Sequence, residues 1–508
     1  MLAIALAAAL LVTPAPDALR RPHDAALRAA LDLLYDGRPD EARRALLAVR
    51  RQAPQDPVGA YLEALVEVWR LEQRAPSAAA DRAFLERADE ALRLADASLA
   101  VDPADPRSLL ARGATQGVKS RFHLFRGQRT DAARAAARMR ADLVRLRELV
   151  PGSADAAFGV GLYDYYADVL SRFAKVLRFL AGLPGGDSVR GLALVESAGE
   201  GSLFHDDEVQ AQLYEIYAFY EDRPDRALSE ARGMRRRHPG WPLWGLRLAE
   251  HLRDRMGLYA ESARVAREHL EAAERGQVNY QGAALVQARV SLGESLLLDL
   301  RFAEARRELL AVKDLSPELA PVVARARLLL GRCLESEGDR EGAVAHYRRA
   351  AQAEGREVRR QAEAALRTPM PAAEVEGLAL VAQARRLHET GRQREAAEAY
   401  RRALRAWPAS REAALFAAED EILHGDPESA RDTVEEAAAQ QRPQPPWLGP
   451  WAVLLRGQLL DASGQRDRAV VEYKKVLERS LGRSDLRERA EDGVRRPFRP
   501  RGKSVNTN

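Results

Sequence analysis

The sequence predicts an all-α protein, folded as a right-handed α-solenoid of helix–turn–helix repeats, and three observations support this fold class. Helix-favouring Ala, Leu, Arg and Glu dominate the 508 residues, and aromatic residues make up only 6%. Strand-favouring runs of Val, Ile, Thr and Tyr are almost absent. A pattern of Gly, Ala and Pro recurs along the chain, and a repeat array of this length needs no single large core.

The recurring pattern is a glycine followed five or six residues later by an alanine. It occurs at Gly37/Ala42, Gly257/Ala263, Gly338/Ala343, Gly391/Ala396, Gly425/Ala430 and Gly464/Ala469. Two further units keep the alanine, Ala227 and Ala305, but carry Asp222 and Leu300 in place of the glycine. We expect the glycine to end the first helix in a left-handed conformation. The alanine is expected where the two helices of a pair cross closely.

Positions around the alanine complete the pattern. A larger side chain follows it four residues later, as in Leu309, Tyr347, Tyr400 and Tyr473. Four units have a proline twelve residues after the alanine: Pro54, Pro239, Pro317 and Pro408. The larger side chain should fill the gap against the next unit, and the proline should stop the second helix because it lacks an N–H group.

This combination resembles the tetratricopeptide repeat, whose period is about 34 residues. Ala396 and Ala430 are 34 residues apart, whereas Ala305 and Ala343 are 38 apart, so the array is irregular. The resemblance extends over most of residues 23–483. It implies a non-enzymatic scaffold that binds a protein or peptide partner in a concave groove.

Shifts in composition divide the chain into segments. They are a signal peptide over 1–18, N-terminal repeats over 19–152, an atypical helical insert over 153–207, repeats over 208–367, C-terminal repeats over 372–483 and a disordered basic tail over 494–508. The Pro-containing stretch Thr368–Pro371 is expected to act as a hinge between two arrays.

The N-terminus suggests a location. The apolar run Leu2–Val12 has 11 residues, which is too short to span a bilayer but suits the apolar region of a secretory signal. We therefore expect an exported, periplasmic protein with a possible association with the bacterial envelope. The alternative is that the run is an ordinary first helix of a cytoplasmic protein. No other stretch suggests a transmembrane segment.

The middle of the chain departs from the repeat. The helix around Phe158–Tyr166 and the loop Leu183–Ser188 do not follow the repeat pattern, and the next unit, Leu213–Leu228, is rich in tyrosine. Over about residues 150–245 these features resemble the tetratricopeptide-39-like (inclusion-body clearance) family. That resemblance implies a non-enzymatic helical protein that works near membranes or lipid. The tyrosines either pack in the core or line an apolar pocket, and the second possibility gives the alternative function of a lipid- or envelope-associated protein.

No residue pattern indicates catalysis, a metal or a cofactor. Cys333 is the only cysteine and lies in an apolar run, which indicates a core position. Gly185–Asp187 lacks the lysine of a phosphate loop, so Asp187 is expected to cap a helix. His205–Glu208 is expected to begin a helix, because acidic residues are favoured there; a metal site is the alternative. We expect no cofactor, and a helical enzyme without a recognisable motif is the least favoured function.

Charge argues against a nucleic-acid partner. The chain has 79 basic and 75 acidic residues, interleaved along nearly every predicted helix, and a net charge of +4. Such patterns are typical of solvated, ion-paired helix faces.

The repeat resemblance also suggests which residues face a partner. In repeats of this type, positions 2, 5, 9 and 12 of the first helix face the concave side, counted with the alanine as position 20. The candidate partner-binding residues at these positions are Arg325, Leu328, Arg332, Val381, Arg385, His388 and Leu415. They predict an apolar floor with basic edges, suited to an amphipathic helix or an acidic segment. The alternative is that the position-5 residues pack against neighbouring helices.

Overall fold

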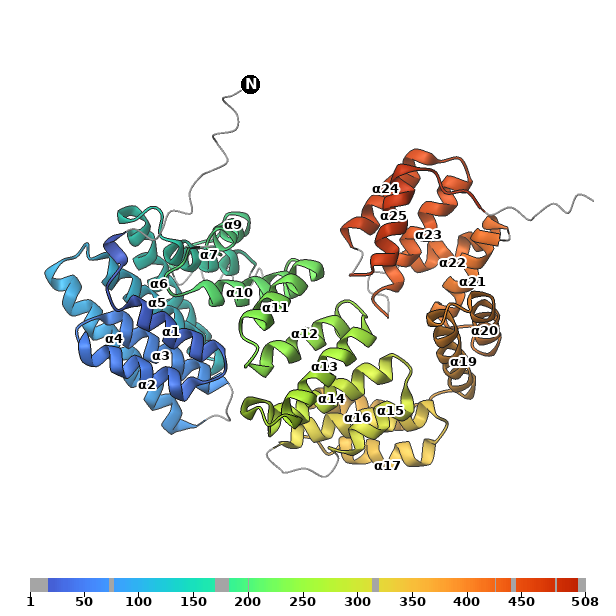
Figure 1. The fold of residues 1–508 in the computed structure, drawn as a ribbon, viewed down its shortest axis with the longest axis horizontal. Helices are drawn as coiled ribbons and strands as arrows, with labels where there is room; N and C mark the ends of the chain where they lie inside the picture. Colours follow the sequence, from blue (N-terminus) through green and yellow to red (C-terminus); the bar gives the residue numbers. More distant parts are fainter. Residues whose placement is uncertain are drawn as a thin grey trace, which may run out of the picture. The chain divides into compact units, whose positions relative to one another are not determined.

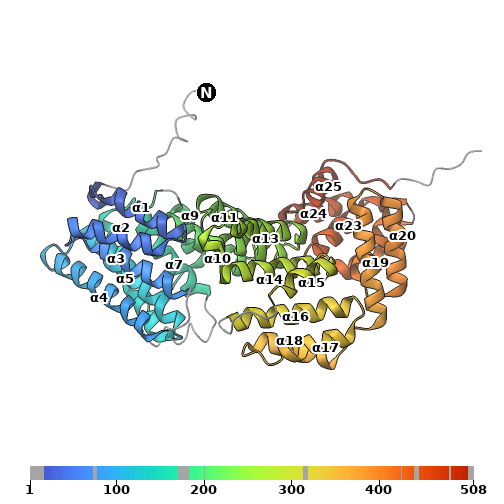
Figure 2. The ribbon, with the colours of Figure 1, turned by 60° about the horizontal axis from the view of Figure 1, so that its bottom comes forward.

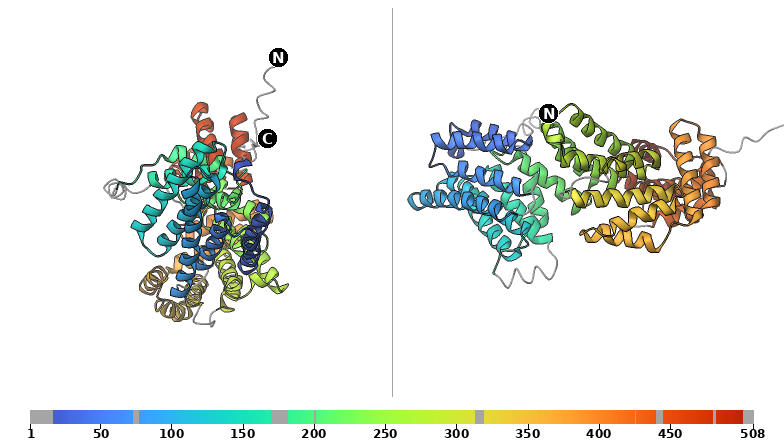
Figure 3. Two further views of the ribbon diagram at one scale, coloured as in Figure 1. Left: turned by 90° about the vertical axis from the view of Figure 1, so that its left-hand side faces the viewer. Right: turned by 90° about the horizontal axis from the view of Figure 1, so that it is seen from below.

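The structure, a computed structural model, describes residues 17–72, 77–169, 182–199, 201–312, 319–424, 426–439, 445–479 and 482–500. Every regular element in these ranges is an α-helix or a short 3₁₀ helix (Figure 1). Within helix pairs such as α16 and α17, the two helices pack on each other, and first helices of neighbouring pairs, such as α14 and α16, also lie side by side (Figures 2 and 3). The predicted all-α fold of stacked helix pairs is confirmed.

The chain forms two compact units. Unit 1 comprises residues up to 222 together with 230–241, and unit 2 comprises 223–229 and 242 onwards. The expected hinge at Thr368–Pro371 lies inside unit 2, and the division of the arrays at this point stays a prediction. The stretch is tied to the preceding repeats, since the backbone N–H of Met370 donates to Glu335 Oε1 at 3.1 Å.

Unit 1 begins with the 3₁₀ helix η1 (Asp17–Leu19) and continues with helix pairs. Its helices are α1 (Asp24–Tyr35), α2 (Pro39–Gln52), α3 (Pro57–Glu72), α4 (Ala78–Val101), α5 (Pro106–Phe125), α6 (Arg129–Leu149), α7 (Ala154–Val169), α9 (Ser188–Ser197) and α10 (Asp206–Phe219). Helix α11 (Pro224–Arg237) contributes residues to both units. Asp187 caps α9, as predicted, because its side chain accepts a hydrogen bond from the backbone N–H of Arg190 at 2.9 Å.

Unit 2 continues the array. Its helices are α12 (Pro242–Asp254), α13 (Tyr259–Glu274), α14 (Ala283–Leu298), α15 (Phe302–Leu310), α16 (Ala320–Ser336), α17 (Arg340–Ala350), α18 (Arg356–Arg367), α19 (Ala372–Glu389), α20 (Gln393–Ala406), α21 (Arg411–His424), α22 (Arg431–Ala438), α23 (Leu448–Ala462), α24 (Arg466–Glu478) and α25 (Ser484–Arg495). Short 3₁₀ helices are η2 (Val278–Tyr280) and η4 (Pro427–Ala430).

The glycine and alanine of the pattern occupy their predicted places. The described glycines of the pattern adopt positive φ angles between the helices of a pair; they are Gly37, Gly257, Gly338, Gly391 and Gly464. Gly425 lies outside the described residues, as does Pro317. The alanines that follow are at most 3% exposed in all six units, so they lie at the helix crossings as expected.

Leu300 replaces the glycine and still adopts the left-handed conformation, with a φ of 60°. This conformation is unfavourable for a side chain with a Cβ. The Leu300 side chain packs against the buried cluster that contains Val381, Ala384 and Tyr400 of the C-terminal repeats. The apolar contact across unit 2 offsets the backbone strain.

A second glycine lets the two helices of a pair approach closely. Gly331 of α16 lies against Tyr347 of α17, and a Cβ at this position would be 2.4 Å from Tyr347 Cε1. The Tyr347 side chain is fully buried, and its hydroxyl donates to Glu335 Oε2 at 2.8 Å. Gly293 meets Leu309 and Gly457 meets Tyr473 in the same way.

Gly331→Ala should therefore lower the free energy of unfolding by about 1–3 kcal/mol, because the buried ring of Tyr347 must shift. Gly245→Ala in α12 is the matched control: its nearest neighbour is at 3.8 Å, so it should stabilise the helix by up to about 1 kcal/mol. Thermal denaturation of both variants tests this. A Gly331→Ala protein that melts at the wild-type temperature would show that the helix pair is looser than described.

The ends of the chain differ from expectation in one respect. Residues 1–16, which include most of the predicted signal peptide, lie outside the described residues, and among those described no helix is long and apolar enough to cross a membrane. The tail was expected to be disordered from residue 494. Instead, Phe498 packs partly buried against the C-terminal core, and its N–H donates to Asp461 Oδ2 at 2.8 Å.

Candidate functional site

A concavity in unit 2 lies between α12, α14 and α16, the first helices of three consecutive pairs. Its volume is about 570 Å³. We call it the central groove. It is lined by Leu243, Leu246, Arg247, Glu250, Arg253, Gln287, Val290, Ser291, Glu294, Pro321, Val322 and Arg325.

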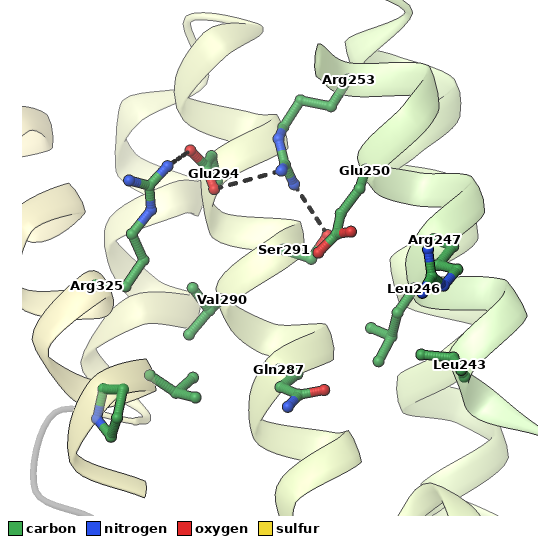
Figure 4. Close-up of a pocket in the computed structure, with 12 residues that line it drawn as sticks. Leu243, Leu246, Arg247, Glu250, Arg253, Gln287, Val290, Ser291, Glu294 and Arg325 are labelled. Atoms are coloured by element: carbon green, nitrogen blue, oxygen red, sulfur yellow. Dashed lines mark hydrogen bonds and ion pairs between the residues drawn. The ribbon is translucent and has the colours of Figure 1, made fainter. Parts of the chain in front are cut away.

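An arginine–carboxylate network connects the three helices of the central groove (Figure 4). Arg253 is 6% exposed; its Nη1 donates to Ser291 Oγ at 3.2 Å, and its Nη2 lies 3.7 Å from Glu294 Oε2. Glu294 also pairs with Arg325. Two further hydrogen bonds, of 2.7 and 2.8 Å, join Arg253 to Asp254. Each of these charges therefore has an opposite partner within the chain.

The remaining lining combines an apolar floor with polar groups at the surface. Leu246 and Val290 are 8% and 6% exposed and form the floor. Figure 4 shows Val290 and Gln287 on α14, between Arg325 on one side and Arg247 on the other. Gln287 is exposed and makes no hydrogen bond to another described residue. The groove thus offers polar groups to a partner above an apolar surface.

The corresponding first-helix face of unit 1 is filled by the chain itself. The segment Ser202–Glu208, which comprises the end of the connection from α9 and the first turn of α10, contacts four first helices of this unit: α1, α3, α5 and α7. Five of its seven residues are at most 7% exposed: Ser202, Leu203, Phe204, His205 and Glu208. We call it the internal segment.

The first helices bind the main chain of the internal segment. Arg28 of α1 donates to the carbonyl oxygens of Ser202 and Leu203, both at 2.9 Å. Asp155 of α7 accepts the backbone N–H groups of Leu203 at 2.8 Å and of Phe204 at 3.1 Å. One guanidinium and one carboxylate therefore bind four main-chain groups of the segment, two carbonyls and two N–H groups. These four bonds do not depend on the identity of the segment's side chains.

Asp155 also anchors the side chains of the internal segment. It accepts hydrogen bonds of 2.6 Å from Ser202 Oγ and from His205 Nδ1, and Tyr61 donates to His205 Nε2 at 2.7 Å. Burial opposes ionisation of Asp155, but the bonds from His205 and Ser202 hold its pKa below the usual range. Burial raises the pKa of Tyr61, so its hydroxyl stays protonated and can donate this hydrogen bond.

Glu208, at the end of the internal segment, is held by three donors. Its Oε1 accepts from Tyr35 Oη at 3.1 Å and from Trp69 Nε1 at 3.0 Å, and Arg121 Nη1 lies 3.4 Å away. The prediction that His205–Glu208 begins a helix is confirmed, since α10 starts at Asp206. Within the described part of the chain, no cluster of His, Cys, Asp and Glu could hold a metal ion.

The first helices α19, α21 and α23 form a third face. A recess of about 420 Å³ lies beside it and is also lined by residues of earlier repeats, including Leu258, Tyr259 and Asp299. Arg385 of α19 binds Glu412 through hydrogen bonds of 2.7 and 2.6 Å and donates to the carbonyl of Leu298 at 3.1 Å. Burial raises the pKa of Asp299, in the same recess, to about 6.

Residues 324–355, which contain most of α16 and all of α17, match the family described as tetratricopeptide repeat. The chain contains a tetratricopeptide repeat. The central groove lies against this repeat, since Arg325 belongs to both.

Two solved structures are similar to the chain. The tetratricopeptide-repeat domain of P58(IPK) has a TM-score of 0.22 and 14% identity, over 74% of this chain and 98% of that chain. The structure of Naa15/Naa10 bound to HypK-THB has a TM-score of 0.19 and 13% identity, over 93% of this chain and 79% of that chain. At such TM-scores neither structure supports a conclusion about this chain, whose all-α fold follows from its own helices. A comparison with curated proteins finds no match. The resemblance to the tetratricopeptide-39-like family stays a prediction.

The predicted partner-binding residues are divided among different places in unit 2. Arg325, in the tetratricopeptide repeat, lines the central groove, whereas Arg385 and the exposed His388 line the C-terminal recess. Arg332 is half-buried and donates to Gln361 Oε1 at 2.9 Å; burial, together with repulsion from Arg325, lowers its pKa.

The predicted apolar floor of Leu328, Val381 and Leu415 is wrong. These side chains are 0%, 2% and 1% exposed and belong to the cores between helices, as the alternative interpretation held. Val290, which occupies position 5 of its unit when counted from Ala305, does form the floor of the central groove, together with Leu246. Arg247 was missed because α12 belongs to a unit with one extra residue before its alanine, and Glu250 was missed because it occupies none of the four counted positions.

The Tyr-rich middle packs mainly in the core of unit 1. Tyr163, Tyr165, Tyr214 and Tyr217 are at most 8% exposed. Their hydroxyls bind local acceptors; for example, Tyr165 donates to Glu221 Oε1 at 2.7 Å. Burial at these positions favours the core interpretation over the apolar pocket.

Proposed function

We propose that the chain is a non-enzymatic scaffold that binds a segment of a partner protein in the central groove. The observation that carries this proposal is the difference between the three first-helix faces. The internal segment fills the face of unit 1, and on the C-terminal face Arg385 is already bound to Glu412 and to the carbonyl of Leu298. The central groove offers Gln287, which makes no hydrogen bond to another described residue, above an apolar floor.

The chemistry of the central groove supports binding rather than catalysis. Arg253 and Glu294 are engaged with each other and with Asp254 and Arg325, so these charges position the helices. The groups left at the surface, such as Gln287, are suited to hydrogen bonding, and the apolar floor is suited to aliphatic or aromatic side chains. A protein segment presents both.

Gln287→Trp tests the proposal, because an indole at this exposed position fills the central groove without touching the core. Gln393→Trp, at an exposed site of α20, is the matched control. Tagged wild-type and variant chains would be used to capture partners from the native cell, with quantification by mass spectrometry. We expect at least a 10-fold loss of the specific partner with Gln287→Trp, equivalent to about 1.4 kcal/mol, and none with the control.

Both variants should melt within a few degrees of the wild type, since neither residue is buried. Equal capture by Gln287→Trp and Gln393→Trp chains would move the partner site away from the central groove.

A further inference from the structure

We infer that the central groove recognises its partner through the main chain of a non-helical segment, with side-chain selection limited to apolar residues over the floor. This inference rests on the proposed function and specifies how the groove would read its partner. Three observations lead to it.

The first observation is the balance of charge and of hydrogen-bonding groups. Three arginines line the groove, and they face Glu250 and Glu294 together with Asp254, which binds Arg253. The lining residues carry a net charge of only +1, from three arginines and two glutamates, and Arg253 is bound by Asp254, so charge gives the groove little means to select an acidic or a basic partner. It does offer donors on Arg247, Arg325 and Gln287 and acceptors on Glu250 and Gln287. A peptide main chain carries one donor and one acceptor in nearly every residue and matches this set.

The second observation is the mode of binding on the first-helix face of unit 1. There an arginine, Arg28, donates to two consecutive carbonyls of the internal segment, and a carboxylate, Asp155, accepts two consecutive N–H groups. The bound residues Ser202–His205 are not helical. The central groove presents the same two residue types, arginine and carboxylate, on first helices of the same kind of pair.

The third observation is the apolar floor. In unit 1 the main-chain bonds accompany the burial of Leu203 and Phe204, which are 2% and 4% exposed. In the central groove, Leu246 and Val290 form the floor, and the half-buried Leu243 and Val322 extend it. Two neighbouring apolar side chains of a partner can be buried there. Its peptide groups can at the same time bind the polar rim of the groove, which consists of Arg247, Glu250, Gln287 and Arg325.

A helical partner fits these observations less well. The N–H and C=O groups of a helix interior bond to one another, so they cannot use the donors and acceptors of the groove. A helix would leave Glu250 and Gln287 to interact with its side chains alone. Recognition through the main chain is therefore the mode that uses the polar rim fully.

The probe for this inference is a synthetic peptide with capped ends that carries the sequence of residues 201–209, GSLFHDDEV. Its binding to the full-length chain would be followed by fluorescence anisotropy. One derivative is N-methylated at Leu203 and Phe204, and its matched control is N-methylated at Val209. A second carries Leu203→Ser and Phe204→Ser. A third removes the acidic charge through Asp206→Asn, Asp207→Asn and Glu208→Gln.

We expect the unmodified peptide to bind the wild-type chain and to lose binding to the Gln287→Trp chain. N-methylation at Leu203 and Phe204, and the double serine change, should each weaken binding at least 10-fold. The control methylation and the removal of charge should change it less than about 3-fold.

Several results would overturn the inference. These are no binding of the unmodified peptide, full affinity after N-methylation at Leu203 and Phe204, affinity that follows the acidic charge, or binding that persists in the Gln287→Trp chain. In each case the proposed function would still stand if Gln287→Trp abolished capture of the native partner. A negative peptide result therefore contradicts this inference alone, and a negative capture result contradicts the proposed function.

Discussion

Asp155→Ala should destabilise unit 1 by about 3–5 kcal/mol, because four buried donors lose their common acceptor. These donors are Ser202 Oγ, the backbone N–H groups of Leu203 and Phe204, and His205 Nδ1. The Asp155 side chain is inaccessible to solvent, so water cannot replace the lost bonds without opening the core. Hydrogen exchange of α1, α3 and α5 measures the effect within unit 1, because it reports local opening helix by helix.

Asp131→Ala on α6 is the control for this change. Asp131 is half-exposed and lies 3.4 Å from Arg134 one turn away. Loss of such a surface pair should change the free energy of unfolding by no more than about 0.5 kcal/mol. If hydrogen exchange in unit 1 were the same for both variants, the internal segment would not be held by Asp155 in the way described.

Arg385→Ala should lower the stability of unit 2 by about 2–3 kcal/mol, since it leaves the carboxylate of Glu412 buried without its main partner. The Arg385 and Glu412 side chains are 16% and 8% exposed. Arg392→Ala is the control, because it removes the same kind of two-bond pair with Glu395 at an exposed site. The control should cost about 0.5 kcal/mol or less. Thermal melting of both proteins compares a buried pair with an exposed one.

The Arg385 experiment also separates the structural interpretation from the one that the sequence suggested. As a partner-binding residue, Arg385 could be replaced without effect on melting, but partner capture would fall. As the structure describes it, Arg385 joins α19 to α21 and to the end of α14, so melting should fall and capture in the central groove should not. A stable Arg385→Ala chain that has lost its partner would restore the sequence-based site.

The fold could be predicted because its determinants are local in sequence. A left-handed glycine, a crossing alanine and an aromatic residue one turn later each act within one helix pair, as Gly338, Ala343 and Tyr347 show. Their spacing is therefore visible in a single sequence. The same locality explains why Asp187 could be identified as a cap: its partner is the N–H of Arg190, three residues away.

The site could be predicted only in part, because it depends on contacts between distant residues. Position counting selected Arg325, which lines the central groove, but it could not show that Arg385 donates to the carbonyl of Leu298, 87 residues away. Nor could it show that Leu328 is enclosed by its own repeat and the next helix. The non-repeat sequence around His205 was recognised as a helix start, yet its role as an occupant of the first-helix face depends on Arg28 and Asp155, 174 and 50 residues away.

Leu300 has a consequence for how unit 2 unfolds. In an array where each repeat touches only its neighbours, the terminal repeats can fray one at a time. Leu300 instead joins the turn after α14 to the cluster around Val381 and Tyr400, about a hundred residues further along the chain. Fraying of the C-terminal repeats must then also expose this side chain, and its left-handed backbone keeps its strain without the compensating contact. Because of this one residue in the place of a glycine, unfolding of the C-terminal repeats is coupled to the turn of a repeat that is distant in sequence.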